Sequence, residues 1–373
     1  MPDAEEEKTP PVIHEEQPTE SNEDTPVAEE TAKEKPPTLN DKIIVMDKPS
    51  ARDALQQLSG SWAASIASRL LDDSRFIREA ALHHAFANPW QDASAPPAAG
   101  TTRAWHQAWF SSARRQDWQG TPGDTRDTGG LVLGGTYSPS STLDLSGYLG
   151  VQQSRMWRSQ HSNHASINTK HLGVALAHRW QNMQWILGAA HSWHTIQSKR
   201  ELTAPGLYDK LQARYHGRTL QLFTELSAPP LYDIAPFTRF AWIRQHTSGY
   251  NEQGGLAALN VEPARHDAQI YTLGLKAQHT LHTKHGPAQL QGELAWHHAS
   301  GDVHTNSHQY FRNSTKQTLF MSEGQALARN AWSVQLGVEA KLGKHGQLGF
   351  GYAGQYASGQ QDHGARVNAG WVF

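Results

Sequence analysis

The sequence predicts an all-β barrel that crosses a membrane and is preceded by an amphipathic helix. From about residue 101 to the end, apolar and polar residues alternate with a period of two, which is the period of a β-strand. The connections between these strands are alternately short and long, as in outer-membrane barrels. The chain has 373 residues with 13 Trp and 31 Gly, and only 18% of them are charged. This composition fits a β-sheet membrane protein better than a helical enzyme.

Residues 1–49 are rich in Glu, Pro and Thr and contain almost no aromatic residues. Such a segment cannot bury enough apolar surface to offset the entropy lost on ordering. We therefore expect a disordered acidic linker, in which the apolar run 43–46 is too short to fold alone. An acidic tail that binds a partner is the functional alternative.

Residues 50–100 are expected to form an amphipathic pore or linker helix and a connector. The helical period covers 51–86, and Gly60 should bend or break it, because Gly costs about 1 kcal/mol relative to Ala inside a helix. A Pro/Ala-rich connector follows at 88–100. A helix packed on some other domain is the alternative. The residues that we assign to the helix include Arg52, Leu55, Leu58, Arg69, Arg75 and Arg78.

Residues 101–373 are expected to form the barrel. The alternation is clearest near the C-terminus, where one face of each strand is apolar and the other is small, polar or charged. Charged residues in the middle of a strand suit a wet lumen better than the packed interior of a β-sandwich. A soluble β-domain is the alternative. The residues expected to face the lumen are Glu293, Glu339, Lys341 and Arg366.

Composition excludes several other classes of protein. The chain has no Cys, which removes disulfides, thiolate catalysis and Cys-based zinc sites. Its formal net charge is −2, so there is no global argument for nucleic-acid binding. The sequence contains no apolar run of about 18 residues, so no transmembrane helix is predicted. The N-terminus lacks the basic and apolar regions of an export signal, so we expect that a signal was removed or that the coding sequence is truncated.

Stretches spread over residues 51–373 resemble the autotransporter β-domain and the segment just before it. They include LQQLSGSWAASIASRLLDDSRFIREAAL at 55–82, DTGGLVLGGTYS at 127–138, IAPFTRFAWI at 234–243 and QDHGARVNAGWVF at 361–373. The resemblance implies twelve antiparallel strands and an N-terminal helix that threads the pore. The alternation gives the same strand count, at roughly 103–111, 128–138, 141–156, 166–180, 184–198, 210–228, 232–246, 265–280, 287–299, 329–342, 346–358 and 364–373.

The same resemblance implies a function and a location. The chain is expected to be an outer-membrane translocator of a Gram-negative bacterium, which anchors and helps to export a passenger at the cell surface. Its expected partners are outer-membrane lipid, the barrel-assembly machinery and a passenger of its own or one encoded separately. We expect a monomer, no nucleic acid and no cofactor. A porin or adhesin barrel without a passenger is an alternative.

The C-terminal strand carries the most specific local signal. In the family this strand ends in an aromatic residue with apolar residues at every second position, and the assembly machinery pairs with it by β-augmentation. The matching residues are Val367, Ala369, Trp371 and Phe373.

Chemical sites are weakly supported by the sequence. Histidine is abundant, at 22 residues, but no HExxH motif occurs and no metal site is expected. No G-x-S-x-G motif is present. The neighbours Asp362 and His363 keep a barrel protease or esterase as an alternative, but they precede the last expected strand, so we predict that the chain is not an enzyme. Four arginines of the helix are expected to pair with lumen carboxylates such as Glu293 and Glu339; these are Arg52, Arg69, Arg75 and Arg78.

Overall fold

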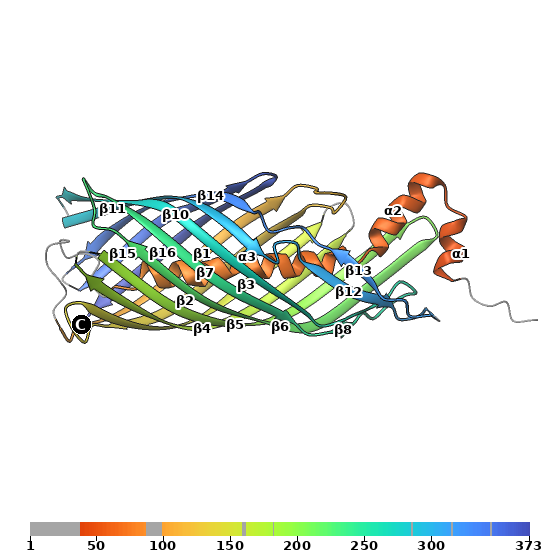
Figure 1. Cartoon of the computed structure of the whole chain (residues 1–373), viewed down its shortest axis with the longest axis horizontal. Coiled ribbons are helices and arrows are strands. Elements are labelled where there is room, and N and C mark those ends of the chain that lie inside the picture. The colour runs from red at the N-terminus through yellow and green to blue at the C-terminus, as the bar shows by residue number, and fades with distance from the viewer. Residues whose placement is uncertain are drawn as a thin grey trace, which may run out of the picture. The chain divides into compact units, whose positions relative to one another are not determined.

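A closed barrel of twelve antiparallel strands forms the main body of the computed structural model, which confirms the predicted fold class (Figure 1). The structure describes residues 38–86, 99–158, 162–181, 183–284, 286–314, 316–343 and 345–373. The first strand, β1 (Thr102–Arg115), pairs with β2 (Asp124–Tyr137) and also with the last strand, β16 (Gln360–Val372). The main sheet therefore has no free edge, as a lipid environment requires.

Nine further strands complete the wall between β2 and β16, and each pairs with its neighbours in the barrel. They are β3 (Leu143–Arg158), β4 (Asn163–Trp180), β5 (Met183–Ala204), β6 (Leu207–Ser227), β7 (Ile234–Thr247), β10 (Ala264–Thr283), β11 (Gly286–Gly301), β14 (Asn330–Leu342) and β15 (Gly346–Ala357).

Burial alternates along the strands as the sequence pattern predicts. In β4, for example, Leu172 and Val174 are more than half exposed on the outside, whereas the intervening positions 171 and 173 are buried. Exposed leucines, valines and aromatic residues of this kind cover the outer wall, while the inner wall is largely polar. This is the reverse of a water-soluble β-domain and matches a barrel surrounded by lipid.

The two ends of the barrel differ in their connections. At one end the links are short, such as 138–142 between β2 and β3 and 228–233 between β6 and β7. At the other end two links are long, 248–263 and 302–329, although others such as 205–206 between β5 and β6 are short. Short turns face the periplasm and long loops face the exterior in outer-membrane barrels. We therefore call the long-loop end extracellular and the end that carries the C-terminus periplasmic.

A second, four-stranded sheet arises from the two long extracellular connections and was not predicted from the sequence. Its order is β13-β12-β9-β8, built from β8 (Tyr250–Asn251), β9 (Leu259–Val261), β12 (Asn306–Phe311) and β13 (Phe320–Glu323). These strands have two to six residues, too short for a recognisable alternation in the sequence.

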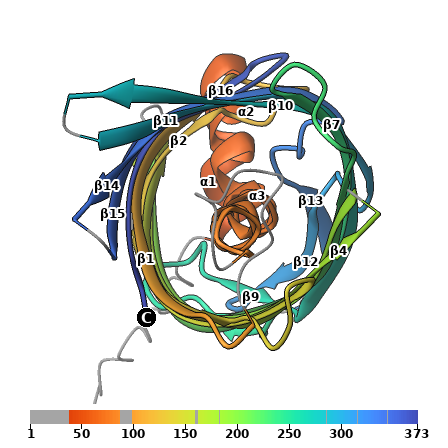
Figure 2. The same ribbon diagram turned by 90° about the vertical axis from the view of Figure 1, so that its left-hand side faces the viewer.

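Three helices precede the barrel: α1 (Leu39–Ile44), α2 (Lys48–Leu58) and α3 (Ser61–His83). The break expected at Gly60 is present, since this residue has φ +69° between α2 and α3. Seen along the barrel axis, α3 lies inside the ring of strands (Figure 2). No helix among the described residues has the length and apolarity needed to cross a bilayer.

The linker expected over 1–49 is wrong for its last part, because α1 and the start of α2 occupy residues 39–49. Thr38 and Asp41 form a capping box that starts α1. Leu39 and Ile43 pack against an apolar cluster on the β5–β6 hairpin, which supplies the apolar contacts that the local sequence lacks. Residues 1–37 of the expected linker and 87–98 of the expected connector lie outside the described residues.

Candidate functional site: a helix enclosed in the barrel lumen

Helix α3 is enclosed on all sides. Of its 23 residues, 18 are buried, and these include polar and charged residues such as Ser65, Ser68 and Arg69 as well as apolar ones. At 1.5 Å per residue the helix is about 35 Å long, enough to cross a hydrocarbon core of about 30 Å. An amphipathic surface helix buries one stripe only. The burial of both faces therefore means that the barrel wall, and not one packing surface, positions α3.

The extracellular end of α3 is held by polar contacts to its backbone and serines. Gln309 of β12 donates to the Ser59 carbonyl at 2.6 Å, and Thr305 donates to the Ala64 carbonyl at 2.8 Å. A Cβ on Gly324 would lie 2.4 Å from the backbone of Ala64 and Ser65, so this loop approaches the helix as only glycine allows. The small extracellular sheet and its loops thus close over the start of α3.

Arginines of the barrel wall contact the same part of the helix. Arg158 of β3 donates to the hydroxyls of Ser61 at 3.2 Å and Ser65 at 2.7 Å, and its guanidinium lies 5.0 Å from the ring centre of Trp62. Arg115 of β1 donates to Ser68 at 2.7 Å. Small hydroxyl residues on α3 let these long side chains reach the helix surface.

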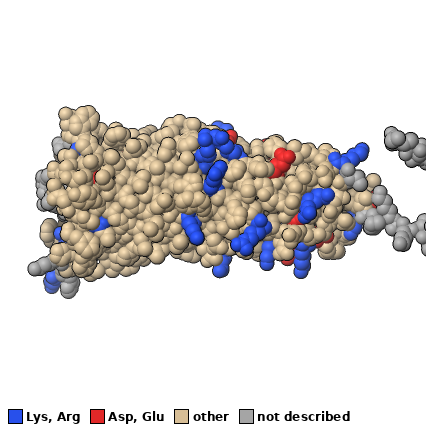
Figure 3. All heavy atoms as spheres, turned by 90° about the horizontal axis from the view of Figure 1, so that it is seen from below, with Lys and Arg blue, Asp and Glu red and all other residues tan. Residues whose placement is uncertain are grey.

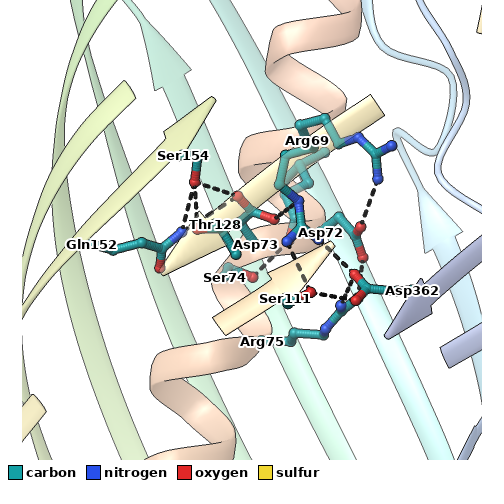
Figure 4. Close-up of polar contacts among 12 residues, drawn as sticks. Arg69, Asp72, Asp73, Ser74, Arg75, Ser111, Thr128, Gln152, Ser154 and Asp362 are labelled. Atoms are coloured by element: carbon teal, nitrogen blue, oxygen red, sulfur yellow. Dashed lines mark hydrogen bonds and ion pairs between the residues drawn. The ribbon is translucent and has the colours of Figure 1, made fainter. Parts of the chain in front are cut away.

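A cluster of ion pairs crosses the lumen at the middle of α3 (Figure 4). Asp362 of β16 pairs with Arg75 of the helix, and it also accepts from Arg126 of β2 at 2.6 Å and from the Ser111 hydroxyl. Arg126 lies 3.1 Å from Asp73 of the helix, whose other carboxylate oxygen accepts from Ser154 at 2.9 Å. Strands from both sides of the barrel seam therefore meet one turn of α3.

A second carboxylate of the wall completes this central cluster. Asp124 of β2 lies 2.7 Å from Arg69 of the helix and 2.5 Å from Arg115 of β1, and its side chain is fully buried. Counted together, the cluster has four guanidinium groups and four carboxylates, two of each from α3 and two of each from the wall. The groups from α3 are Arg69, Asp72, Asp73 and Arg75, and those from the wall are Arg115, Asp124, Arg126 and Asp362.

This balance has an electrostatic consequence. The wall and the helix are each neutral in this layer, so the helix adds no net charge to the lumen when it enters. Removing one charge from a buried pair leaves its partner uncompensated, which costs roughly 3–5 kcal/mol. The cluster therefore fixes the rotation and depth of α3 more strongly than it adds to the overall stability.

The periplasmic third of α3 is packed by aromatic rings. Phe76 stacks on Trp109 of β1 with ring centres 5.9 Å apart. His84, just after the helix, stacks on Trp105 at 4.4 Å. A Cβ on Gly130 would lie 2.2 Å from the Trp109 ring, so a glycine on the neighbouring strand lets this ring lie flat on the wall. The lumen is thus filled by stacked rings where the polar contacts become fewer.

Polar contacts also end the helix at this side. Arg78 donates to Gln221 of β6 at 2.8 Å, and His83 lies 2.8 Å from Glu339 of β14. Arg103 of β1 donates to the Phe86 carbonyl at 3.2 Å, which holds the chain as it leaves α3. The contacts therefore continue along the whole length of the helix.

The space left beside α3 is small. A cavity of about 40 Å³ lies between the helix and the β14–β16 wall, near Glu79, Gln335 and Arg366. This volume has room for a few water molecules. It is far too narrow for an extended polypeptide, so in this state the lumen is closed by α3.

The predicted helix residues fall into two environments. Leu58 is buried at the end of α2, whereas Arg52 and Leu55 of the same helix are exposed. Three other predicted residues lie on α3 within the lumen; these are Arg69, Arg75 and Arg78. As expected, two of them pair with lumen carboxylates, but Arg69 pairs with Asp124 and Arg75 with Asp362 instead of the carboxylates named from the sequence. Arg78 bonds to the uncharged Gln221.

The residues expected to face the lumen take other partners. Glu293 pairs with Arg239 of the wall at 2.6 Å, and Glu339 contacts His83 and Asn368. Arg366 donates to Gln335 at 2.7 Å. Lys341 is exposed near the periplasmic end of β14. Strand parity alone indicates the inner face but not the height in the barrel, which is why Glu293 and Glu339 were named in place of Asp124 and Asp362.

The C-terminal strand closes the barrel against β1, with Val372 opposite Arg103. Its outward residues Val367, Trp371 and Phe373 are exposed on the outer wall, at 40%, 51% and 72%. Ala369 shares their face, opposite His106. The inward residues of the strand include Asp362, which the sequence analysis placed before the strand and which is instead part of the central ion-pair cluster.

The residues that suggested an enzyme or a metal site do not converge in the described part of the chain. Asp362 and His363 lie on opposite faces of β16, because the first is buried in the lumen and the second is exposed outside. Among the described residues no group of three or more His, Asp and Glu side chains is placed to hold a metal ion. His161 and His285 lie outside the described part of the chain.

Comparison with known proteins places the barrel among secretion proteins. A family model described as the autotransporter β-domain matches residues 104–353. Two curated relatives, both extracellular serine proteases from Serratia marcescens, are 28% and 27% identical over 328 and 333 residues. These matches cover 86% and 87% of this chain but 31% of each relative. The chain thus spans about a third of the length of the curated relatives that it matches.

Two solved structures share the fold. The translocator domain of the autotransporter NalP from Neisseria meningitidis has a TM-score of 0.62 at 13% identity, covering 83% of this chain and 98% of that domain. The β-domain of the Bordetella autotransporter BrkA has a TM-score of 0.53 at 13% identity, covering 73% and 100%. At this identity the likeness concerns the fold alone.

Proposed function

This chain belongs to the autotransporter β-domain family, and we propose that its barrel delivers an N-terminal passenger to the cell surface and is then closed by α3. As a translocator β-domain it is an outer-membrane protein of a Gram-negative bacterium. The passenger is a separate question, because the relatives named as proteases are about three times as long as this chain.

One observation carries the proposal: α3 lies in the lumen with its N-terminal end toward the extracellular loops. The chain before Ser61 therefore emerges on the extracellular side, where α2 packs against the β5–β6 hairpin. The chain after α3 returns to the wall and enters β1 at the periplasmic end. This path is the one left by a chain whose N-terminal part has passed outward through the pore.

The test is the accessibility of an epitope in intact cells. An epitope placed immediately before residue 38 should bind antibody on intact cells, because that part of the chain should lie outside. The same epitope placed in the periplasmic turn 228–233 is the matched control and should bind only after the outer membrane is opened. An epitope before residue 38 that stays inaccessible in intact cells, in a correctly folded barrel, would refute the outward path.

We also propose that the C-terminal strand is recognised during assembly and that the barrel is a monomer in lipid. Trp371 and Phe373 are exposed on the outer wall near the periplasmic end, and β16 is the strand that must close against β1. A partner that pairs with β16 before closure would read the alternate side chains of this strand. Deletion of Phe373 should reduce the assembled barrel in cells while barely changing the stability of barrel refolded in vitro. Equal losses in both settings would leave only a role as a membrane anchor.

Finally, we propose that the barrel itself is not an enzyme. The residue types that suggested a protease do not converge, because Asp362 is engaged by two arginines and His363 lies on the other side of the wall. Refolded protein should not turn over peptide or acyl-ester substrates. Turnover that is lost in an Asp362→Asn variant would contradict this.

A further inference from the structure

The outer wall of the barrel carries a one-sided basic patch on its extracellular half. Viewed from below, Lys and Arg side chains gather on the half of the barrel toward α1 and α2, with a few Asp and Glu among them, and an uncharged stretch of wall separates them from the few charged groups at the end that carries the C-terminus (Figure 3). Five outward-facing, exposed cations of β3 to β6 make up what we call the basic patch; these are Arg155, Lys170, Lys199, Arg214 and Arg218.

Strand register brings these side chains together. Lys170 is opposite Trp193, and Trp193 is opposite Arg218, so two cations flank one exposed aromatic ring across three strands. A second row lies four residues further toward the exterior. In it Arg155 is opposite Ser166, and Arg214 is opposite Gln197, which in turn is opposite Ser166. A third row, opposite His164, contains Lys199.

The patch begins sharply where the apolar band ends. On β4, Lys170 is followed by the outward residues Leu172 and Val174, and on β6, Arg218 is followed by Leu220 and Leu222. Residues two apart on a strand are separated by about 6.6 Å. The change from hydrocarbon-facing to charged side chains therefore occurs within one such step, at the level where lipid headgroups begin.

Within the described residues none of the five cations of the patch forms an ion pair, whereas Arg244 and Arg265 both pair with Asp267. Arg155 nevertheless lies directly opposite an acidic residue, Asp127 of β2, and the other four cations have no acidic residue opposite them. No outward position of β3 to β6 between the first and third rows is Asp or Glu. The opposite wall lacks the feature, since the outward residues at the extracellular ends of β11, β14, β15 and β16 include aromatics and His but neither Lys nor Arg.

The height of the patch indicates the kind of headgroup. From Lys170 to His164 the three rows extend over six residues, or about 20 Å along the strand and about 15 Å along the barrel axis at a strand tilt of about 40°. The headgroup layer of an ordinary phospholipid is only about 5–8 Å thick on each side. Between the cations lie uncharged hydrogen-bonding side chains such as Asn168, Thr195 and Gln197, which suit sugar hydroxyls. The patch therefore fits a large headgroup that carries phosphate at more than one level together with sugar.

We propose that the basic patch binds phosphorylated glycolipids of the outer leaflet, with the guanidinium groups on phosphate and the neutral side chains on sugar. Arg forms bidentate hydrogen bonds with phosphate, and Lys supplies a point charge at the same level. Such binding would hold one side of the barrel, β3 to β6, against lipid, whereas the seam between β1 and β16 offers one outward cation, Arg114. The inference rests on the outer-membrane location and goes beyond the translocator role.

The test compares two variants with the same change in charge. The patch variant is Lys170→Gln, Arg214→Gln and Arg218→Gln; the control is Lys48→Gln, Arg52→Gln and Arg329→Gln, three exposed cations outside the barrel wall. Each full-length protein is reconstituted with a bis-phosphorylated glycolipid or with its dephosphorylated form. Bound glycolipid per folded barrel is counted by native mass spectrometry, with inorganic phosphate as a competitor in a parallel arm.

Wild type and control should prefer the phosphorylated form, and the patch variant should bind it roughly ten- to hundredfold less tightly. About 10 mM inorganic phosphate should not displace the lipid, because free phosphate lacks the multivalency of the headgroup. Three results would each overturn the proposal: equal retention of the two glycolipids by wild type, unchanged binding in the patch variant, or full displacement by free phosphate. None of them bears on the outward path of the N-terminal chain, which the epitope test decides separately.

Discussion

Helices α2 and α3 follow each other with only two residues between them, yet they are held in opposite ways. In α2 a single stripe is buried, with Ala54 and Leu58 against Leu202 and Leu207 of the β5–β6 hairpin, while Leu55 is 57% exposed. In α3 every face is buried, and the contacts at its middle are ion pairs. The lesson is that α2 docks outside the pore through an apolar stripe and a few hydrogen bonds at Gln56 and Gln57, whereas α3 depends on matched ion pairs inside it.

The two helices also differ in how far each could shift from its position without losing its contacts. Apolar packing of the α2 kind accepts small shifts, because hydrophobic contact is non-directional. A buried ion pair cannot shift in this way, because a displaced charge would be left without its partner. We therefore expect the position of α3 to be defined within one helical turn and that of α2 to be softer.

The largest effect is expected from Asp362→Ala. The substitution leaves Arg75 and Arg126 buried without their shared carboxylate, at a cost of roughly 3–5 kcal/mol. Trypsin cleavage after Arg75 should then become much faster in the folded barrel, since α3 must leave its place to be cut. The matched control is Asp127→Ala, an outward-facing carboxylate on β2. Equal cleavage rates in the two variants would mean that the ion-pair cluster does not hold α3.

A smaller effect, confined to α2, is expected from Leu58→Ala. Removing this buried side chain should cost about 2–5 kcal/mol of the docking of α2. Leu55→Ala, on the exposed side of the same helix, should change it by no more than about 0.5 kcal/mol. Hydrogen exchange of the α2 amides would report both, and exchange in α3 should stay slow in each variant. Similar responses to the two substitutions would contradict the single buried stripe.

Gly60→Ala should have the smallest effect of the three. Gly60 has φ +69°, a conformation that costs a residue with a Cβ roughly 1–2 kcal/mol, and the added carbon would also meet the Gln309 side chain. Exchange should rise at the α2–α3 junction while the barrel keeps its resistance to SDS before heating. A variant with unchanged exchange at the junction would show that the bend is set by the flanking contacts alone.

Much of the barrel could be predicted from the alternation of apolar and polar residues, but the extracellular ends of its strands could not. The strands β1 and β2 run on to Arg115 and from Asp124, beyond the expected 103–111 and 128–138. Their inner residues there are polar partners of α3, and their outer residues lie above the lipid. Neither face is apolar, so the period-two signal disappears although the pairing continues.

Which wall residues contact α3 inside the lumen could not be predicted from the sequence, for a different reason. The inward parity of Glu293 and Glu339 follows from the sequence, but which residues share a height depends on the register of all twelve strands and on the depth of α3. Asp362 shows the problem, because 287 residues separate it from Arg75. The break at Gly60, by contrast, is local and could be predicted from one residue.

The most direct test of the central claim, that α3 closes the lumen, is the conductance of the reconstituted barrel. The full chain should show little steady conductance in a planar bilayer, because α3 lies in the lumen and contacts the wall along its whole length. A chain lacking residues 1–86 should keep the heat-dependent gel mobility of a folded barrel and open a much larger, steady pore. Equal conductance of the two folded proteins would contradict the account and place the barrier to ion flow in the loops or the wall instead of the helix.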